Sequence, residues 1–291
     1  MRVVLTGASG MVGAYLLEGL VASGHDVIAW SGADAGRRHG LPLAPVDLAD
    51  AEATARALTR ADPDAIVHAA AISTTDAVNR DPERARAVNV DATERLAAWC
   101  GRHERRLIYT STDLVFDGSK PWSREDDLAV PVPLYGRTKL AAEPAVLAVP
   151  RGLVARISLQ FGPSRSGRES YFDRTLLALR QGRPQAFFED EFRTPLDLPT
   201  TAAILVRLVA SDVTGRLHVA GRERVSRYEL ARRIAIAWGL DAGLVRANRH
   251  SDVTLAEPRP ADVSLDTSRL AACLPDPPRP TIDEALERMA R

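Results

Sequence analysis

The strongest limit on the fold comes from TGASGMVG, residues 6–13, which stands between an apolar run and a helical pattern. It places glycines at positions Gly7, Gly10 and Gly13. Glycine permits a tight turn and lets the backbone approach a pyrophosphate, while the amino end of the following helix supplies amides and positive potential. Because strand, loop and helix follow in this order, the stretch predicts dinucleotide binding, against the alternative of a purely structural turn.

Apolar runs alternate with helical patterns through the first half of the chain, which is typical of βαβ units and a parallel sheet. The predicted strands are residues 3–6, 26–30, 65–69, 106–110, 153–157 and 216–221. The predicted helices are residues 11–23, 50–60, 82–103, 135–148, 171–181 and 200–211, with another that opens at a Ser226/Glu229 capping box. The Pro-rich residues 275–280 are predicted to form an extended connector.

These elements predict an α/β fold, a Rossmann-type doubly wound parallel sheet with a smaller, partly interleaved C-terminal substrate lobe. Residues 1–160 would form the NAD(P)-binding Rossmann domain and residues 161–291 mainly the substrate-binding lobe, with segments near 190–221 returning to the Rossmann domain. A cleft between the lobes is the expected place for a small-molecule substrate.

Composition excludes several classes of function. The formal net charge of the 291 residues is zero, which gives no case for binding nucleic acid or an anionic membrane. The sequence has no run of 18 apolar residues and no signal-like start, so we expect a soluble cytoplasmic protein. Two isolated cysteines and six scattered histidines predict neither a disulfide framework nor a metal site.

The residues after the second predicted strand bear on the choice of cofactor. An acidic residue at this strand end is typical of NAD binding, but the chain has Ser31 there, Asp34 later, and then Arg37 and Arg38. Ser31 and an arginine would suit a 2′-phosphate, which favours NADP(H). The alternative is that Asp34 turns back to the ribose of NAD(H) and the arginines cover a loop. Asp47 could contact the adenine or form part of a surface turn.

A tyrosine and a lysine stand four residues apart in LYGRTKLAAE, and so share one face of a predicted helix. An adjacent Lys139 ammonium would lower the pKa of Tyr135 from about 10, letting the phenol exchange a proton with a carbonyl oxygen as hydride moves. Lys120 and Lys139 are the only lysines among 38 basic residues. A compact ammonium suits ribose hydroxyls better than a guanidinium does. The alternative is a surface pair on an amphipathic helix.

The stretch IYTSTDLVFDG, residues 108–118, lies at the C-terminal end of a predicted strand and offers hydroxyl side chains there. This end of the strands is where ligands bind to a doubly wound sheet. Ser111 or Thr112 could hold a substrate carbonyl beside Tyr135. Ordinary capping of a turn is the alternative.

These motifs, with VHAAA at residues 67–71 and Asn89, together resemble the extended short-chain dehydrogenase/reductase family. STDLVFDG, YGRTKLAAE and RPADVSLDTSRL are most similar to the dTDP-4-dehydrorhamnose reductase subgroup, and the resemblance covers nearly the whole chain. It implies reduction of a nucleotide-linked 4-keto-6-deoxy sugar by hydride from a nicotinamide, with Thr112, Tyr135 and Lys139 as catalytic residues. The residues after the second strand favour NADP(H) as that cofactor, with NAD(H) as the alternative.

The residue arguments and the resemblance together give a set of predicted contacts. Those to the cofactor are Gly7, Gly10, Met11, Val12, Gly13, Ser31, Arg37, Asp47, Leu48, Ala69, Ala70, Ala71, Ser111, Tyr135 and Lys139. Those to the substrate are Asp113, Val115, Phe116, Arg193 and Arg259.

Two positions depart from the pattern of the rhamnose-forming enzymes. Leu159 replaces an aromatic residue in RISLQFG, and Arg193 stands where a small residue is usual, so a different sugar stays open. Two other functions also stay open: a nucleotide-sugar epimerase or dehydratase, and a non-catalytic regulatory subunit similar to that of methionine adenosyltransferase. A homodimer is carried as a hypothesis.

Overall fold

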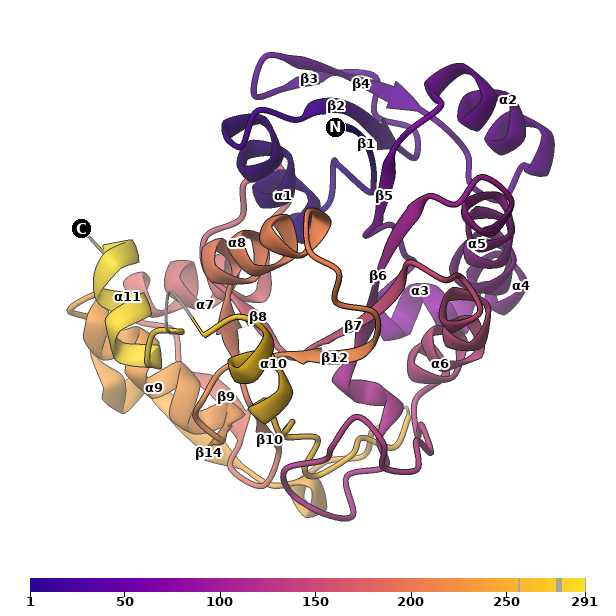
Figure 1. Cartoon of the computed structure of the whole chain (residues 1–291). Helices are drawn as coiled ribbons and strands as arrows, with labels where there is room; N and C mark the ends of the chain where they lie inside the picture. Colours follow the sequence, from indigo (N-terminus) through magenta and orange to yellow (C-terminus); the bar gives the residue numbers. More distant parts are fainter. Residues whose placement is uncertain (256, 276–278, 291) are drawn as a thin grey trace.

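The computed structural model describes residues 1–255, 257–275 and 279–290 (Figure 1). In this part of the chain, eight strands form one sheet in the order β12-β7-β6-β5-β1-β2-β4-β3. Their bounds are β1 Arg2–Thr6, β2 Asp26–Ser31, β3 Arg37–Arg38, β4 Leu41–Pro45, β5 Ala65–His68, β6 Arg106–Thr112, β7 Gly152–Ile157 and β12 Gly215–Val219. All neighbours are parallel except β3 and β4. The predicted doubly wound α/β fold is confirmed.

Helices cover both faces of this sheet. Figure 1 shows α1 (Met11–Ala22) and α8 (Leu198–Val209) side by side on one face, where they share a hydrophobic core with the strands. The other face carries α2 (Ala51–Ala61), α5 (Ala92–Arg102) and α6 (Leu134–Leu147). The short helices α3 (Thr75–Arg80) and α4 (Pro82–Arg86) precede α5. Apolar residues on both faces explain why the strands read as nearly continuous hydrophobic runs.

The smaller lobe is built from the second half of the chain. Its helices are α7 (Tyr171–Arg180), α9 (Arg227–Ala237) and α11 (Ile282–Ala290), which pack around Phe161, Phe172 and Ile234. Short strands pair as β8 (Gln160–Phe161) with β11 (Leu196–Asp197), β10 (Phe192–Arg193) with β13 (Val225–Ser226), and β9 (Gln185–Phe188) with β14 (Val245–Asn248). α10 (Ser268–Cys273) lies beside β12, which extends the main sheet. The division at residue 160 stays a prediction.

Local differences from the predicted elements have physical causes. The expected helix over residues 82–103 is interrupted by a π-helical turn, η1 (Ala87–Asp91). Within it, the Asn89 amide accepts from Ile72 N and donates to Ile72 O, both at 2.9 Å, so a side chain ties this wider turn to a loop. The predicted cap is present, because Ser226 Oγ accepts from Glu229 N at 3.0 Å. The predicted connector at 275–280 falls partly outside the described residues.

None of the helices in the described residues is both long and apolar enough to cross a bilayer.

Candidate active site

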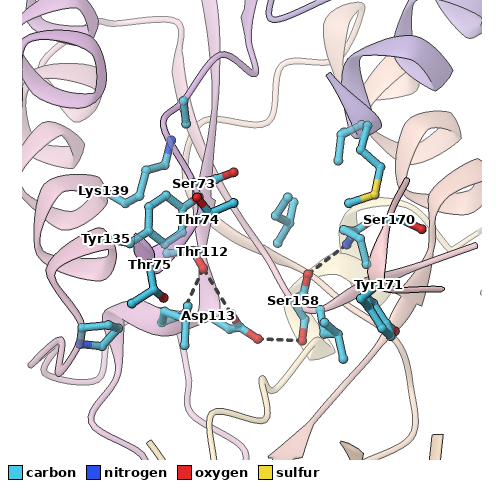
Figure 2. A pocket seen from close by; sticks show the side chains of 18 of the residues that line it. Ser73, Thr74, Thr75, Thr112, Asp113, Tyr135, Lys139, Ser158, Ser170 and Tyr171 are labelled. Carbon is cyan, nitrogen blue, oxygen red and sulfur yellow. Dashed lines mark hydrogen bonds between the residues drawn. The ribbon is translucent and has the colours of Figure 1, made fainter. Parts of the chain in front are cut away.

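A cavity of about 770 Å³ lies at the carboxyl ends of the parallel strands, with the smaller lobe forming part of its wall. Figure 2 shows Thr112, Tyr135 and Lys139 on one side of it and Ser170 and Tyr171 opposite. The predicted site residues in its wall are Gly10, Met11, Val12, Gly13, Ala69, Ala71, Ser111, Thr112, Asp113, Tyr135, Lys139, Arg193 and Arg259.

The glycine loop is packed too closely for side chains at two of its positions. Gly7 has φ +69°, and a Cβ there would lie 2.7 Å from Ala70 N. A Cβ on Gly13 would lie 2.0 Å from Gly7 O. This arrangement brings the first turn of α1 to the wall of the cavity, where its backbone can approach a pyrophosphate.

Lys139 is almost fully buried in the cavity wall, one helical turn after Tyr135 in α6. Its Nζ lies 4.1 Å from the centre of the Tyr109 ring, and no hydrogen-bond partner for it occurs among the described residues. Burial lowers the Lys139 pKa to about 7, although the Glu143 carboxylate opposes this. A buried donor facing the cavity without an acceptor fits the ribose hydroxyls of a dinucleotide.

The pKa of Tyr135 differs from the sequence-based prediction. Burial raises it above the ordinary tyrosine value, and the negative charge of Asp113 raises it further. The predicted lowering by Lys139 was wrong because spacing along a helix does not report how deeply both groups are buried. Tyr135 is therefore protonated at neutral pH, the form that can donate a proton.

A short hydrogen-bonded chain follows β6. Thr112 Oγ1 donates to Asp113 Oδ1 at 3.1 Å, and Ser158 Oγ donates to Asp113 Oδ2 at 2.9 Å. Burial raises the pKa of Asp113, while Arg193 acts in the opposite direction. Ser158 was missed by the sequence analysis; its one signal was a hydroxyl directly after β7, at the same edge of the sheet.

The Ser111 side chain is hydrogen-bonded to the buried ion pair of Glu143 and Arg156. Its Oγ donates to Glu143 Oε1 at 2.7 Å, and Arg156 donates to both oxygens of Glu143 at 2.9 and 2.7 Å. Arg216 Nε lies 3.4 Å from the same carboxylate. Sequence reasoning missed this network, although a carboxylate one turn after Lys139 was visible in YGRTKLAAE.

The predicted substrate contacts Arg193 and Arg259 belong to a second charged cluster in the cavity wall. Buried Arg193 pairs with Glu191 at 3.0 Å, and Arg259 Nε lies 3.0 Å from the other oxygen of Glu191. Val115 and Phe116 pack in a hydrophobic cluster with Val263 instead, and neither is among the residues lining the cavity in the described chain. The structure therefore does not bring these two predicted substrate contacts to the cavity.

Six other predicted cofactor contacts lie outside the cavity wall. They are Ser31, Arg37 and Asp47, which were predicted near the adenosine, and Gly7, Leu48 and Ala70. Ser31 Oγ donates to Asp34 O, and Arg37 donates to Gly40 O. Asp47 pairs with Arg84 at 2.7 Å, which lowers the pKa of Asp47. Their roles stay predictions.

No group of three or more His, Cys, Asp or Glu side chains in the described ranges is arranged to hold a metal ion.

A glycine loop opening a βαβ sheet, with a tyrosine and lysine on one helix beside the carboxyl end of β6, defines the extended short-chain dehydrogenase/reductase class. The chain belongs to the RmlD substrate binding domain family, whose model matches residues 1–291. The resemblance seen in the sequence motifs is confirmed.

The relatives of this chain include both a reductase and a subunit of a methionine adenosyltransferase. The dTDP-4-dehydrorhamnose reductase of Mycolicibacterium smegmatis is 34% identical over 276 residues, 93% of this chain and 79% of that protein. Methionine adenosyltransferase 2 subunit beta of Bos taurus is 33% identical over 278 residues, 92% of this chain and 81% of that protein. The structure of dTDP-4-dehydrorhamnose reductase from Bacillus anthracis in complex with NADP superposes with a TM-score of 0.86 at 22% identity, covering 99% of this chain and 98% of that one.

Proposed function

We propose that this protein is an NADP(H)-dependent reductase of a nucleotide-linked 4-keto-6-deoxy sugar. The observation that carries the proposal is that protonated Tyr135 and buried Lys139, whose amino group has no hydrogen-bond partner among the described residues, lie in the wall of one cavity. The name of the mycobacterial relative supports the substrate class, and the NADP in the Bacillus anthracis structure supports the cofactor.

In this proposal each side chain of the site has a task. A bound nicotinamide supplies the hydride. Lys139 donates to the ribose hydroxyls, and Tyr135 gives its proton to the sugar carbonyl oxygen. The Thr112 hydroxyl can turn from Asp113 to the same oxygen and orient it.

The cations of the smaller lobe support a nucleotide-linked substrate. Arg168, Arg174 and Arg227 line the same cavity as Tyr135. Guanidinium groups bind phosphate oxygens in a bidentate manner, so a diphosphate fits this wall.

A second candidate is a non-catalytic regulatory subunit, because the bovine methionine adenosyltransferase subunit matches 92% of the chain at 33% identity. This candidate predicts cofactor binding without turnover.

Oxidation of NADPH and of NADH with dTDP-4-keto-6-deoxy sugar separates the two candidates, with a cofactor titration in parallel. We expect NADPH oxidation by the natural sequence. Tyr135→Phe should lower kcat about 10²- to 10⁴-fold, the usual contribution of a general acid, with the cofactor Kd nearly unchanged. Binding without oxidation by the natural sequence would favour the regulatory candidate. Substantial turnover by Tyr135→Phe would contradict its role as proton donor.

A further inference from the structure

The first amide of the helix that carries Tyr135 and Lys139 donates its hydrogen bond to a distant part of the chain. α6 begins at Leu134, and Pro133 before it supplies no side-chain cap within the described structure. The first amides of a helix need acceptors from outside the helix. Leu134 N donates to Glu257 Oε1 at 2.7 Å, a contact between residues 123 positions apart.

Glu257 also reaches a second element of the cofactor-binding side. Asn79 Nδ2, at the end of α3, lies 3.5 Å from Glu257 Oε2. α3 and α6 pack against each other, so one carboxylate touches two neighbouring helices. A negative charge at this position also interacts favourably with the helix dipole of α6.

The segment around Glu257 forms part of the cavity wall. Leu255, Glu257, Pro258, Arg259 and Pro260 all line it. Two residues beyond Glu257, Arg259 pairs with buried Glu191 of the smaller lobe. The segment is thus joined to the smaller lobe by the ion pair of Arg259 and to α6 by the hydrogen bond to Glu257.

We propose that Glu257 is a positioning residue that sets the start of α6, and with it the Tyr135 phenol, relative to the substrate wall. The inference rests on the proposed function, in which Tyr135 gives the proton. Tyr135 is the residue directly after Leu134, so a shift of the first turn moves its side chain. Displacements of about 1 Å at a reacting group can cost up to about 10²-fold in rate. Glu257 itself lines the cavity. It therefore fixes the distance between a substrate bound against this wall and the Tyr135 proton donor.

Local caps elsewhere in the fold provide a contrast. Asp50 is the N-cap residue of α2, and its side chain accepts a hydrogen bond from Ala53 N at 2.9 Å. It lies outside the cavity wall. Loss of this cap should lower stability without changing catalysis, which makes Asp50→Ala a matched control.

The test compares Glu257→Ala, Glu257→Gln and Asp50→Ala by steady-state kinetics, NADPH titration and thermal unfolding. We expect Glu257→Ala to lower kcat about 5- to 20-fold, with the NADPH Kd within about twofold of the natural value. Glu257→Gln keeps an acceptor oxygen and should recover most of kcat. Asp50→Ala should lower Tm and leave kcat unchanged. A natural kcat in Glu257→Ala, or a Glu257→Gln variant no better than Glu257→Ala, would overturn the inference.

Hydrogen exchange gives a second readout that does not depend on turnover. In Glu257→Ala, the amides at the start of α6 should exchange faster than in the natural protein, while those of α2 are unchanged. Unchanged protection at Leu134 and Tyr135 would show that Glu257 does not hold the helix start. A natural protein that fails to oxidise NADPH defeats the proposed function, whereas the exchange result still decides whether Glu257 fixes α6.

Discussion

At the scale of one residue, the burial of Lys139 in the site lowers the stability of the folded protein. The Lys139 ammonium is buried against the Tyr109 ring, and its pKa falls to about 7. Between that value and about 10.4, the unfolded chain holds a proton that the folded protein has lost. The stability of the folded state should therefore rise with pH across this interval, because the free energy needed to remove the Lys139 proton on folding falls as the pH approaches the unfolded pKa.

Replacing Lys139 with methionine tests this cost. Lys139→Met has nothing to titrate, so its stability relative to the natural protein should be highest at pH 6.5 and should decline by on the order of 3 kcal/mol by pH 9.5. Urea unfolding at the two pH values measures the difference. Lys120→Met is the matched control, since exposed Lys120 pairs with Asp127 outside the cavity. A pH-independent difference for Lys139→Met would contradict the lowered pKa.

At the scale of an element, the approach of α6 to the turn after β6 requires a glycine. A Cβ on Gly136 would lie 2.2 Å from the backbone oxygen of Leu114, in the short helix η2 (Asp113–Val115). Backbone atoms cannot move aside as a flexible side chain can. This contact sets the position of the first turn of α6, which carries Tyr135, against η2.

Gly136→Ala should therefore destabilise the protein by about 2–3 kcal/mol and lower kcat, because α6 must shift away from Leu114. Gly101 in α5 meets nothing within 4 Å, so Gly101→Ala should stabilise the protein by about 0.5–1 kcal/mol through helix propensity. Chemical denaturation and steady-state kinetics of both variants provide the check. Equal effects of the two substitutions would show that the close contact has no consequence.

The elements also show what local patterns can predict. Alternating runs predicted six of the strands in the main sheet and most helices, because hydrophobic periodicity is a local property. The short strand β4, which pairs in parallel with β2, was not predicted. The π-helical turn at Asn89 escaped prediction, since it depends on a contact with Ile72 from another loop. Tyr135 and Lys139 were found by their spacing. Glu143, Ser158 and Glu257 were missed because their hydrogen-bond partners are distant in sequence. For Val115 and Phe116, no local pattern indicated that the side chains pack in a hydrophobic cluster and not in the cavity wall.

At the scale of the whole molecule, the two halves of the sequence share structure. α8 packs on α1, and β12 extends the sheet beside β7. Buried Arg106 of β6 donates to Leu208 O at 3.0 Å and Val213 O at 2.6 Å, which ties the end of α8 to the sheet. The hydrophobic core on this face runs from Val3 to Leu270. Unfolding of the second half would therefore remove part of the core of the first.

This sharing predicts a single unfolding transition, even though the chain forms two lobes around the cavity. Scanning calorimetry should show one peak whose calorimetric and van't Hoff enthalpies agree. NADP⁺ should move the whole peak upward, by a stabilisation of about 2.7 kcal/mol at 100 times its Kd. NAD⁺ at the same concentration should move it less if the cofactor is NADP(H). Two peaks, of which NADP⁺ shifts only one, would mean that the lobes fold independently and that α8 and β12 add little to the first half.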